Sequence, residues 1–405
     1  MILRRVLDCA RLDTSGKHRF FVTCARGTEG ALRRELASMR IAGAKGERGG
    51  VRFEGPLPMA MGVCLHARVA VRVLLEIATF DAGDADSLYA GARAVDWRSW
   101  LDARSTLAVD ASVRDTPTLQ HSGYAALKVK DAVVDALRDR LGARPDVDPK
   151  RPDVSIVLHL AAGRAGLFLD LAGEPLHRRG YRVAMTEAPL KETLAAAVLA
   201  LGGVEADRPF VDPMAGSGTL AIEHALAARG IAPGLRRRFG FERWPVVTGG
   251  GALEAAWGRL RAEAEAAAEA PRAALPPIVC GDLSPEAVGA ARRNASAAAV
   301  DDDLTFEVAD VARLERRWPT GTVCTNPPYG ERMGGEGGAG ALHALYAGMG
   351  RAFQRLGGWS VVVLSGNPAF SRALPGKPRV SHRLWNGPLE VRLLRYEIGP
   401  AKVAR

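Results

Sequence analysis

The sequence predicts an α/β protein whose C-terminal half forms a doubly wound, Rossmann-like parallel sheet, preceded by two smaller α+β modules. Three observations support this fold class. Strands and helices alternate regularly from Leu190 onward, which is typical of a parallel sheet covered by helices. A Gly-rich turn at residues 212–219 joins the first of these strands to its helix. The N-terminal half alternates over shorter elements and has no Gly-rich phosphate loop.

The first N-terminal module is predicted from its apolar spacing. Residues 28–39 place Leu32, Leu36 and Met39 on one face of a helix, and Gly49-Gly50 leads into a strand. The expected elements are strands 18–24, 49–53 and 69–80 and helices 28–39 and 59–67. This order is typical of a ferredoxin-like α+β module, and we assign residues 1–68 to it.

A second α+β module is predicted over residues 69–184. It has a strand at 107–113, an amphipathic helix at 124–141 and a hairpin with strands at 154–160 and 167–171. A dense basic stretch, His177-Arg178-Arg179-Gly180-Tyr181-Arg182, follows the hairpin. Residues 187–189 read as a linker to the C-terminal domain, which we place at residues 185–405.

The C-terminal domain is predicted to contain seven strands. A helix starts at Leu190, and a hairpin turning at Asn386-Gly387 closes the domain. The expected strands are 209–211, 278–280, 304–308, 322–325, 360–365 and the two arms of hairpin 379–398, and the expected helices are 219–229, 285–298 and 342–356. Residues 253–270, rich in Ala, Glu and Arg, are expected to form a solvent-exposed helix that Pro271 stops.

Composition limits the class of protein. The 405-residue chain has a formal net charge of +10, a pI of about 9.7 and an ordinary hydrophobic fraction of 47%. A basic excess of this size fits a polyanionic partner, because each neutralised phosphate releases a counterion. An Arg-rich, solvated surface without such a partner would give the same excess. The position of the basic residues therefore has to distinguish the two interpretations.

Cysteine and histidine placement excludes several site classes. The five cysteines show no C-x-x-C pair, and the eight histidines form no H-E-x-x-H, so no metal site is expected. Scattered cysteines in odd number favour a reducing compartment. The sequence start lacks an apolar signal-peptide core, and no apolar run reaches membrane-spanning length. We therefore expect a cytoplasmic protein.

The turn Asp212-Pro213-Met214-Ala215-Gly216-Ser217-Gly218-Thr219 follows the first strand of the sheet. Gly216 and Gly218 allow the backbone to approach a ligand in conformations that a Cβ would forbid. Ligands of doubly wound sheets bind outside the carboxyl ends of the strands. The spacing matches neither the dinucleotide fingerprint nor the P-loop. A Gly-rich turn without a ligand is the plain alternative, and the placement favours ligand binding.

Two carboxylates follow the next two strands. Asp282 can accept hydrogen bonds from ribose hydroxyls, as acids at this position do for nucleotide-containing cofactors. It could instead cap the helix at Pro285, but Ser284 is the better N-cap and leaves Asp282 for a ligand. Asp310 can accept a hydrogen bond from an adenine amino group; alone, such a residue is more often a helix cap.

The segment Asn326-Pro327-Pro328-Tyr329 follows the fourth strand. Consecutive prolines fix an extended turn, which would direct the Asn326 side chain and the Pro327 carbonyl to one point. An exocyclic amine is a poor nucleophile because its lone pair is delocalised, and two acceptors would hold its protons and aim the lone pair at a methyl donor. Tyr329 offers a face for stacking a base pulled out of its helix. A polar turn that ends a strand is the alternative.

In this order and spacing, the four motifs resemble class I S-adenosylmethionine-dependent methyltransferases over about residues 189–398. With the N-terminal modules and the segment Leu176–Arg182, the chain resembles the THUMP-containing RNA guanine-N2-methyltransferases, nearest those that act on bacterial 23S rRNA. The likeness is to the N-terminal half of a larger fused enzyme. Family members commonly carry a second acid at the position of Ser284.

The resemblance implies roles for particular residues. S-adenosylmethionine would contact the Gly-rich turn, the two acids and the helix at Leu190, and the target base would be received by the N-P-P-Y turn. The cofactor set is Asp212, Pro213, Ala215, Gly216, Ser217, Gly218, Thr219, Asp282, Leu283, Asp310, Asn326, Glu192 and Thr193, and the catalytic set is Asn326, Pro327, Pro328 and Tyr329. RNA contacts are expected at Lys128, Lys130, Arg178, Arg179 and Arg182.

Three other functions stay open. A transfer RNA guanine-N2-methyltransferase would share this architecture. A DNA or protein N-methyltransferase would also use N-P-P-Y, although the upstream modules and the basic stretch disfavour it. A non-catalytic RNA-binding protein would not need four intact motifs. A pyrimidine-carbon mechanism needs a nucleophilic thiol, and Cys324 lies in a strand where core packing is its expected role. Guanine N2 rather than adenine N6 depends on family likeness, and a monomer is the default expectation.

Overall fold

The computed structural model describes residues 17–185, 189–271, 273–329 and 338–399. They form two compact units, each considered by itself. Unit 1 comprises residues up to 23, 33–176 and 237–263, and unit 2 comprises residues 24–32, 177–236 and 264 onward. The sequence start and most of the predicted linker 187–189 lie outside the described residues. No helix in the described part of the chain is long and apolar enough to cross a bilayer.

Unit 1 is built on one mixed sheet of eight strands, in the order β2-β3-β1-β4-β8-β7-β5-β6. Its long strand β4 pairs antiparallel with β1 on one side and with β8 on the other, so both predicted N-terminal modules share this sheet. The strands are β1 (His18–Thr23), β2 (Lys45–Glu47), β3 (Gly50–Gly55), β4 (Arg72–Asp81), β5 (Thr106–Arg114), β6 (Asp146–Val147), β7 (Val154–Ala161) and β8 (Arg164–Asp170). The division at residue 68 stays a prediction.

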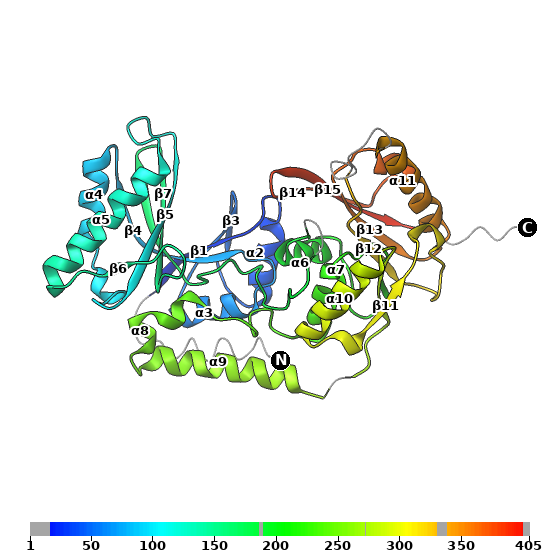
Figure 1. Cartoon of the computed structure of the whole chain (residues 1–405), viewed down its shortest axis with the longest axis horizontal. Helices are drawn as coiled ribbons and strands as arrows, with labels where there is room; N and C mark the ends of the chain where they lie inside the picture. The colour runs from blue at the N-terminus through cyan, green and yellow to red at the C-terminus, as the bar shows by residue number, and fades with distance from the viewer. Residues whose placement is uncertain (1–16, 186–188, 272, 330–337, 400–405) are drawn as a thin grey trace, which may run out of the picture. The chain divides into compact units, whose positions relative to one another are not determined.

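The helices of unit 1 follow from caps and apolar faces. Helix α5 (Ser122–Leu141) buries one face and ends where Gly142 takes a left-handed conformation, φ 69°. Helix α4 (Ala85–Ala94), which the sequence analysis did not predict, starts at a capping box between Asp84 and Ser87. Figure 1 shows α4 and α5 side by side next to the sheet. The N-terminal module contains two further helices, α2 (Glu29–Ser38) and α3 (Leu57–His66). The first turn of α2 belongs to unit 2.

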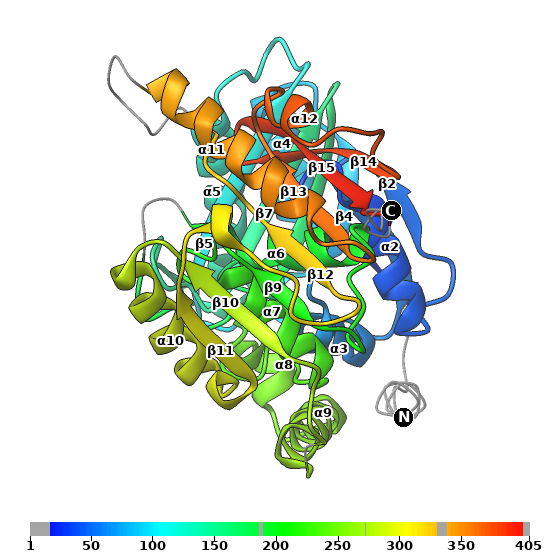
Figure 2. The ribbon, with the colours of Figure 1, turned by 90° about the vertical axis from the view of Figure 1, so that its right-hand side faces the viewer.

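Unit 2 contains the predicted doubly wound sheet of seven strands, in the order β11-β10-β9-β12-β13-β15-β14 (Figure 2). The first five strands are parallel, and the final hairpin inserts β15 antiparallel to β13. The strands are β9 (Phe210–Asp212), β10 (Ile278–Asp282), β11 (Leu304–Val308), β12 (Thr322–Thr325), β13 (Ser360–Ser365), β14 (Val380–Asn386) and β15 (Leu389–Glu397). The predicted fold class is confirmed.

Helices cover both faces of the unit 2 sheet. Phe210 stacks on His224 of α7, whereas its neighbour Val211 belongs to a core cluster with Tyr346 and Phe353 of α11. Successive strand residues point to opposite faces, so α7 and α11 lie on opposite sides. The helices are α6 (Glu192–Leu201), α7 (Thr219–Ala228), α10 (Pro285–Ala298), α11 (Gly338–Gln354) and α12 (Phe370–Ala373).

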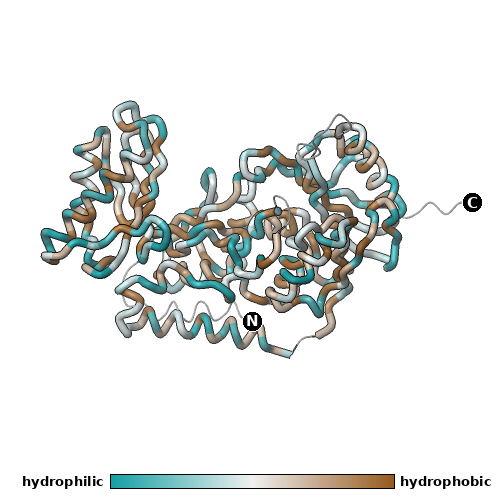
Figure 3. Tube along the Cα trace, viewed as in Figure 1, coloured by the Kyte–Doolittle hydropathy of each residue, from teal (hydrophilic) through white to brown (hydrophobic). Residues whose placement is uncertain are grey.

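The helix predicted to be solvent-exposed, α9 (Ala252–Glu269), has a buried face, so that prediction is wrong. Trp257 is 7% exposed and packs edge-on against Phe239 and Phe241, with ring centroids 5.5 and 4.8 Å away. Figure 3 shows apolar and polar residues mixed along this helix. The many charged residues of this helix made its apolar face, formed by Ala256, Trp257, Leu260 and Ala264, hard to recognise in the sequence. A 3-10 turn η2 (Gly240–Arg243) and the short helix α8 (Pro245–Thr248) precede it.

Candidate functional site

The four sequence motifs meet at one edge of the unit 2 sheet. Parallel strands end at the same edge, and the register pairs Cys280 with Asp212 and Asp282 with Val308. Two cavities open there, of about 620 and 470 Å³. From the predicted set, the larger is lined by Asp212, Ala215, Gly216, Ser217, Thr219, Asp282, Asn326, Pro327, Pro328 and Tyr329. The smaller is lined by Pro213, Leu283 and Asp310.

The Gly-rich turn is tied to strand β10. Gly216 and Gly218 have φ values of 53° and 84°, the left-handed region that favours glycine. The Ala215 amide donates to the Gly281 carbonyl at 2.8 Å, and the Gly216 amide donates to Asp282 Oδ2 at 2.9 Å. A Cβ on Gly218 would approach the Cβ of Ala291 in α10 to 2.9 Å. The two glycines therefore permit a tight, fixed turn, and Gly218 itself serves packing and lines neither cavity.

The acids of the site differ in environment. Asp212 is buried, and this burial raises the pKa of its carboxyl to about 7. Asp282 is partly exposed and accepts hydrogen bonds from the amides of Gly216, at 2.9 Å, and Ser284, at 3.0 Å. The predicted N-cap role of Ser284 is confirmed, because its hydroxyl accepts from the Ala287 amide at 3.1 Å. Asp282 is thus a fixed acceptor at the cavity wall.

The smaller cavity suits a flat, apolar group with polar edges. Leu283 and Val308 are 70% and 57% exposed beside it. Asp310 caps the 3-10 turn η4 (Val311–Arg313) by accepting from the Ala312 amide at 2.8 Å. Each carboxylate oxygen has two lone pairs, so this cap leaves Asp310 further acceptor capacity.

The N-P-P-Y turn is held from α11 and from the loop after β13. The Tyr346 hydroxyl donates to the Pro328 carbonyl at 2.7 Å. The Asn367 amide nitrogen donates to the Tyr329 carbonyl at 3.2 Å, and a Cβ on Gly366 would come within 2.7 Å of the Tyr329 ring. The Tyr329 hydroxyl donates to Asn326 Oδ1. Asn326 is therefore already oriented as an acceptor at the larger cavity.

Comparison with known proteins places this site in a family. A model of the RMKL-like methyltransferase domain matches residues 179–394, just over half of the chain. The chain belongs to the RMKL-like methyltransferase family. A THUMP domain matches residues 82–170, and the RlmL ferredoxin-like domain matches residues 19–74. The resemblance stated from the sequence is confirmed.

The relatives of this RMKL-like protein include a ribosomal RNA large subunit methyltransferase K/L from Syntrophotalea carbinolica, 41% identical over 94% of this chain. The alignment covers 53% of that relative, so the chain spans about half the length of the curated proteins it matches. Among solved structures, the methyltransferase SMU.472 complexed with SAH has a TM-score of 0.85 at 30% identity, covering 96% of this chain and 100% of that one.

A further structural relative, described as an N6-adenine-specific DNA methylase from Listeria monocytogenes, has a TM-score of 0.84 at 31% identity. It covers 95% of this chain and 97% of its own. The RMKL-like fold therefore occurs in relatives whose names give different substrates.

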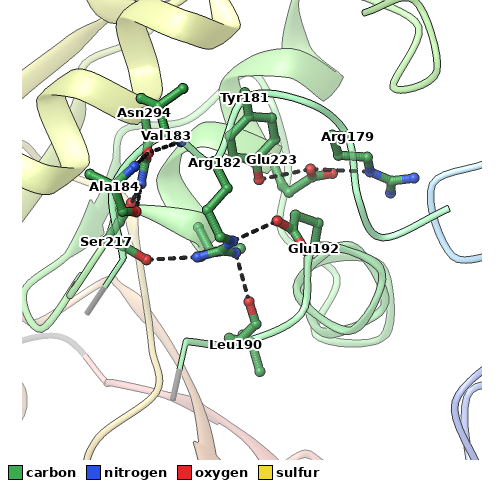
Figure 4. A network of polar contacts seen from close by, with 11 residues as sticks. Arg179, Tyr181, Arg182, Val183, Ala184, Leu190, Glu192, Ser217, Glu223 and Asn294 are labelled. Atoms are coloured by element: carbon green, nitrogen blue, oxygen red, sulfur yellow. Dashed lines mark hydrogen bonds and ion pairs between the residues drawn. The ribbon is translucent and has the colours of Figure 1, made fainter. Parts of the chain in front are cut away.

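Two basic residues predicted to contact RNA instead form ion pairs inside the RMKL-like domain. Arg179 is 3% exposed and pairs with the buried carboxylate of Glu223 at 3.5 Å, so its prediction as an RNA contact is wrong. The Arg182 side chain is 16% exposed and donates to four acceptors of unit 2 (Figure 4). The sequence predicted both side chains to be exposed because they belong to a basic stretch. Tertiary structure decides which side chains are buried, and the sequence does not show it.

The other predicted RNA contacts lie nearer the surface. Arg178 of unit 2 is exposed. In unit 1, Lys128 is partly exposed with its ammonium 5.6 Å from the Tyr124 ring centroid, and Lys130 pairs with Asp131 at 2.9 Å. These residues stay candidates for RNA contact.

Glu192 and Thr193, predicted to contact the cofactor, are buried at the start of α6 and line neither cavity. Glu192 instead accepts from Arg182 at 2.8 Å, and burial raises the pKa of its carboxyl. Leu190, at the start of the helix expected to contact the cofactor, does line the larger cavity, and residues of that cavity that were not predicted include Met185, Glu286, Arg293 and Asn386. They come from loops and helix faces distant in sequence, without a motif to mark them.

Two kinds of site that the sequence did not predict are a nucleophilic thiol and a metal site. Cys324 is fully buried in β12, and burial raises the pKa of its thiol well above the usual value, so core packing is its role. Within the ranges that the structure describes, no group of three or more His, Cys, Asp or Glu side chains could hold a metal ion.

Proposed function

We propose that this chain transfers a methyl group from S-adenosylmethionine to the exocyclic N2 amine of a guanosine in large-subunit ribosomal RNA. One observation carries the proposal: the Gly-rich turn and the N-P-P-Y turn line the same cavity of about 620 Å³. A methyl donor on the first turn and a planar amine at the second would therefore be adjacent, as direct transfer requires.

The residues present fit S-adenosylmethionine. When bound, this cofactor supplies an electrophilic methyl group on its sulfonium. Asp212 and the Gly-rich turn would hold its methionine end, and Asp282 has oxygens that can accept from the ribose hydroxyls. The exposed Leu283 and the carboxylate of Asp310, in the neighbouring cavity, suit the flat adenine and its amino group. The SAH complex of a 30% identical relative supports this choice.

Asn326 and Pro327 would act on the target amine through their oxygens. An aromatic amine donates its lone pair to the ring, and two acceptors on its protons favour a tetrahedral nitrogen whose lone pair is free to attack. The Tyr329 hydroxyl now donates to Asn326 Oδ1, so an incoming amine either uses the second lone pair of this oxygen or displaces the hydroxyl. Once displaced, Tyr329 would be available to stack on the base.

The substrate assignment draws on the relatives. The curated relatives that are 40–41% identical over more than nine tenths of this chain are named as large-subunit rRNA methyltransferases, and the matched THUMP domain favours structured RNA over DNA. A ribosomal substrate would place the enzyme in the cytoplasm. Transfer RNA guanine N2 is the closest competing substrate, and the name of the Listeria relative gives adenine N6 as a competing chemistry.

Substitution of Asn326 tests the catalytic assignment. In Asn326→Ala we expect methyl transfer to fall at least about a hundredfold, because a transition-state acceptor is lost, while S-adenosylhomocysteine binds within twofold of wild type. Transfer is measured with labelled S-adenosylmethionine and large-subunit rRNA from cells lacking this protein, and binding by calorimetry.

Nucleoside mass spectrometry of the same reactions identifies the product. N2-methylguanosine in rRNA supports the proposal, whereas N6-methyladenosine, or labelling of tRNA alone, assigns one of the competing substrates. Full activity in Asn326→Ala would remove Asn326 from the mechanism.

A further inference from the structure

The basic stretch that begins at His177 contacts the segments that would hold the cofactor. We call residues 177–184 the strap. Within it, the Arg182 guanidinium donates from Nε to Glu192 at 2.8 Å and from Nη1 to Ser217 Oγ at 2.9 Å. Its Nη2 donates to the Leu190 carbonyl at 3.0 Å and to Thr219 Oγ1 at 3.1 Å. Figure 4 shows this fork between the strap, the start of α6 and the Gly-rich turn.

A second side chain holds the end of the strap to the same turn. Asn294 of α10 is fully buried, and its Oδ1 accepts from the amides of Val183 and Ala184, each at 2.9 Å. Its Nδ2 donates to the Ala184 carbonyl at 2.9 Å and to the Ser217 carbonyl at 3.0 Å. Ser217 is thus held through its hydroxyl by Arg182 and through its carbonyl by Asn294 (Figure 4).

We propose that Arg182 is a positioning residue that sets the affinity for S-adenosylmethionine by fixing Ser217 and Thr219 of the Gly-rich turn. This inference rests on the proposed function, since it names a determinant of the same cofactor site. Arg182 touches the turn from behind: it does not line the larger cavity, whereas Ser217 and Thr219 do.

The chemistry of arginine explains why one residue can do this. Its planar guanidinium presents five donors in a fixed fork, and here the fork reaches four acceptors on two segments. Ser217 and Thr219 are each 4% exposed, so water has little access to replace these hydrogen bonds. The turn is therefore ordered before a ligand arrives, and binding free energy is not spent on ordering it.

Lysine at this position would keep the charge beside Glu192 and lose the fork. A lysine ammonium is a single point with three donors and cannot span the distance between Glu192, Ser217 and Thr219. Arg182→Lys therefore separates positioning of the turn from neutralisation of the buried Glu192 carboxylate.

Arg229 supplies a matched control in the same unit. Its side chain is 10% exposed and it donates to Asp303 with Nε at 2.8 Å and with Nη2, so it too is a nearly buried arginine fork on a carboxylate. It lies past the C-terminal end of α7 and lines neither cofactor cavity. Arg229→Lys should cost folding stability as Arg182→Lys does, without reaching the Gly-rich turn.

The experiment measures calorimetric affinity for S-adenosylhomocysteine, KM for S-adenosylmethionine, kcat and melting temperature in the full chain. For Arg182→Lys we expect Kd and KM to rise about tenfold, the worth of one or two charge-assisted hydrogen bonds, with kcat and RNA affinity within twofold. Arg229→Lys should keep the wild-type Kd and KM. Adding Ser217→Ala to Arg182→Lys should raise Kd by a smaller factor than Ser217→Ala does in the wild-type background, because part of the effect of that hydroxyl depends on Arg182.

The outcomes distinguish the positioning role of Arg182 from the proposed function. A wild-type Kd in Arg182→Lys, an equal rise in Arg229→Lys, or a loss of kcat with KM unchanged would overturn the positioning role while leaving the proposed function intact. Failure of the wild-type protein to bind S-adenosylhomocysteine would overturn the proposed function and the inference with it.

Discussion

At the scale of single residues, the carboxyl of Asp212 is the site group whose charge is most sensitive to pH. Burial raises the pKa of this carboxyl to about 7, against an ordinary value of 3.8. In the ligand-free protein, Asp212 is therefore largely protonated below pH 7. Its contribution to folding stability is full below its unfolded-state pKa and is lost as pH rises through its folded pKa.

The same carboxyl makes cofactor binding pH-dependent. The methionine ammonium of the cofactor favours an ionised Asp212, so binding should release a proton and affinity should rise with pH. Between about pH 5.5 and pH 7 we expect affinity for S-adenosylhomocysteine to rise several-fold, with a limit of tenfold per pH unit. Calorimetry in two buffers of different ionisation enthalpy measures both the affinity and the released proton.

Asp212→Asn is the control for this titration. It should bind more weakly and show a flat affinity profile over the same range, because no proton remains to be released there. A flat profile in the wild-type protein would show that binding releases no proton from Asp212 and would contradict this prediction.

At the scale of elements, the buried parallel strands could be predicted well from the sequence. The ranges 322–325 and 360–365 match the fully buried strands β12 and β13, because short apolar runs between turn residues are typical of strands covered on both faces. The range 304–308 also matches β11, an edge strand in which only Leu304 is buried. Helix α4 was missed because its two buried residues, Leu88 and Ala92, leave little apolar pattern to detect.

Contacts between distant elements could not be predicted in this way. Each of the four motifs is local, so its spacing was readable in the sequence. Arg182 reaches Ser217 and Thr219 across more than thirty residues, and Tyr346 and Asn367 hold the N-P-P-Y turn from two other segments. No periodicity marks such partners, because they are chosen by the packed arrangement of helices and loops.

Close packing of α11 on α12 gives a prediction about stability. A Cβ on Gly350 would come within 1.9 Å of the Ala373 carbonyl oxygen, and backbone atoms cannot move aside cheaply. Gly350→Ala should therefore lower the free energy of unfolding by about 1–3 kcal/mol, despite the better helix propensity of alanine. Denaturant unfolding measures this loss.

Gly340 on the same helix is the matched control, because a Cβ there meets no atom of the described residues within 4 Å. Gly340→Ala should stabilise by up to about 1 kcal/mol. If the two substitutions gave the same change, the close approach of α12 to α11 would not constrain this position.

At the scale of the whole molecule, the number of basic residues overstates how many of them can contact RNA. The 55 lysines and arginines include arginines that pair with buried carboxylates inside the protein. Arg179 pairs with Glu223 and Arg182 with Glu192, each with the carboxylate side chain no more than 4% exposed. In unit 1, Arg72 likewise pairs with the buried Asp170. Burial therefore decides which basic side chains can contact RNA, and the sequence does not display burial.

The remaining basic residues still predict salt-dependent RNA binding. Phosphate contacts release counterions, so RNA affinity should fall about a hundredfold or more between 50 and 200 mM salt, while affinity for S-adenosylhomocysteine should stay nearly constant. Lys128→Ala should reduce the log–log slope by about one, the share of one phosphate contact. Lys377→Ala, exposed in unit 2 and outside the predicted RNA contacts, should leave the slope unchanged. Filter binding of a large-subunit rRNA transcript measures the slope, and a flat salt response in the wild-type chain would contradict RNA recognition through these phosphate contacts.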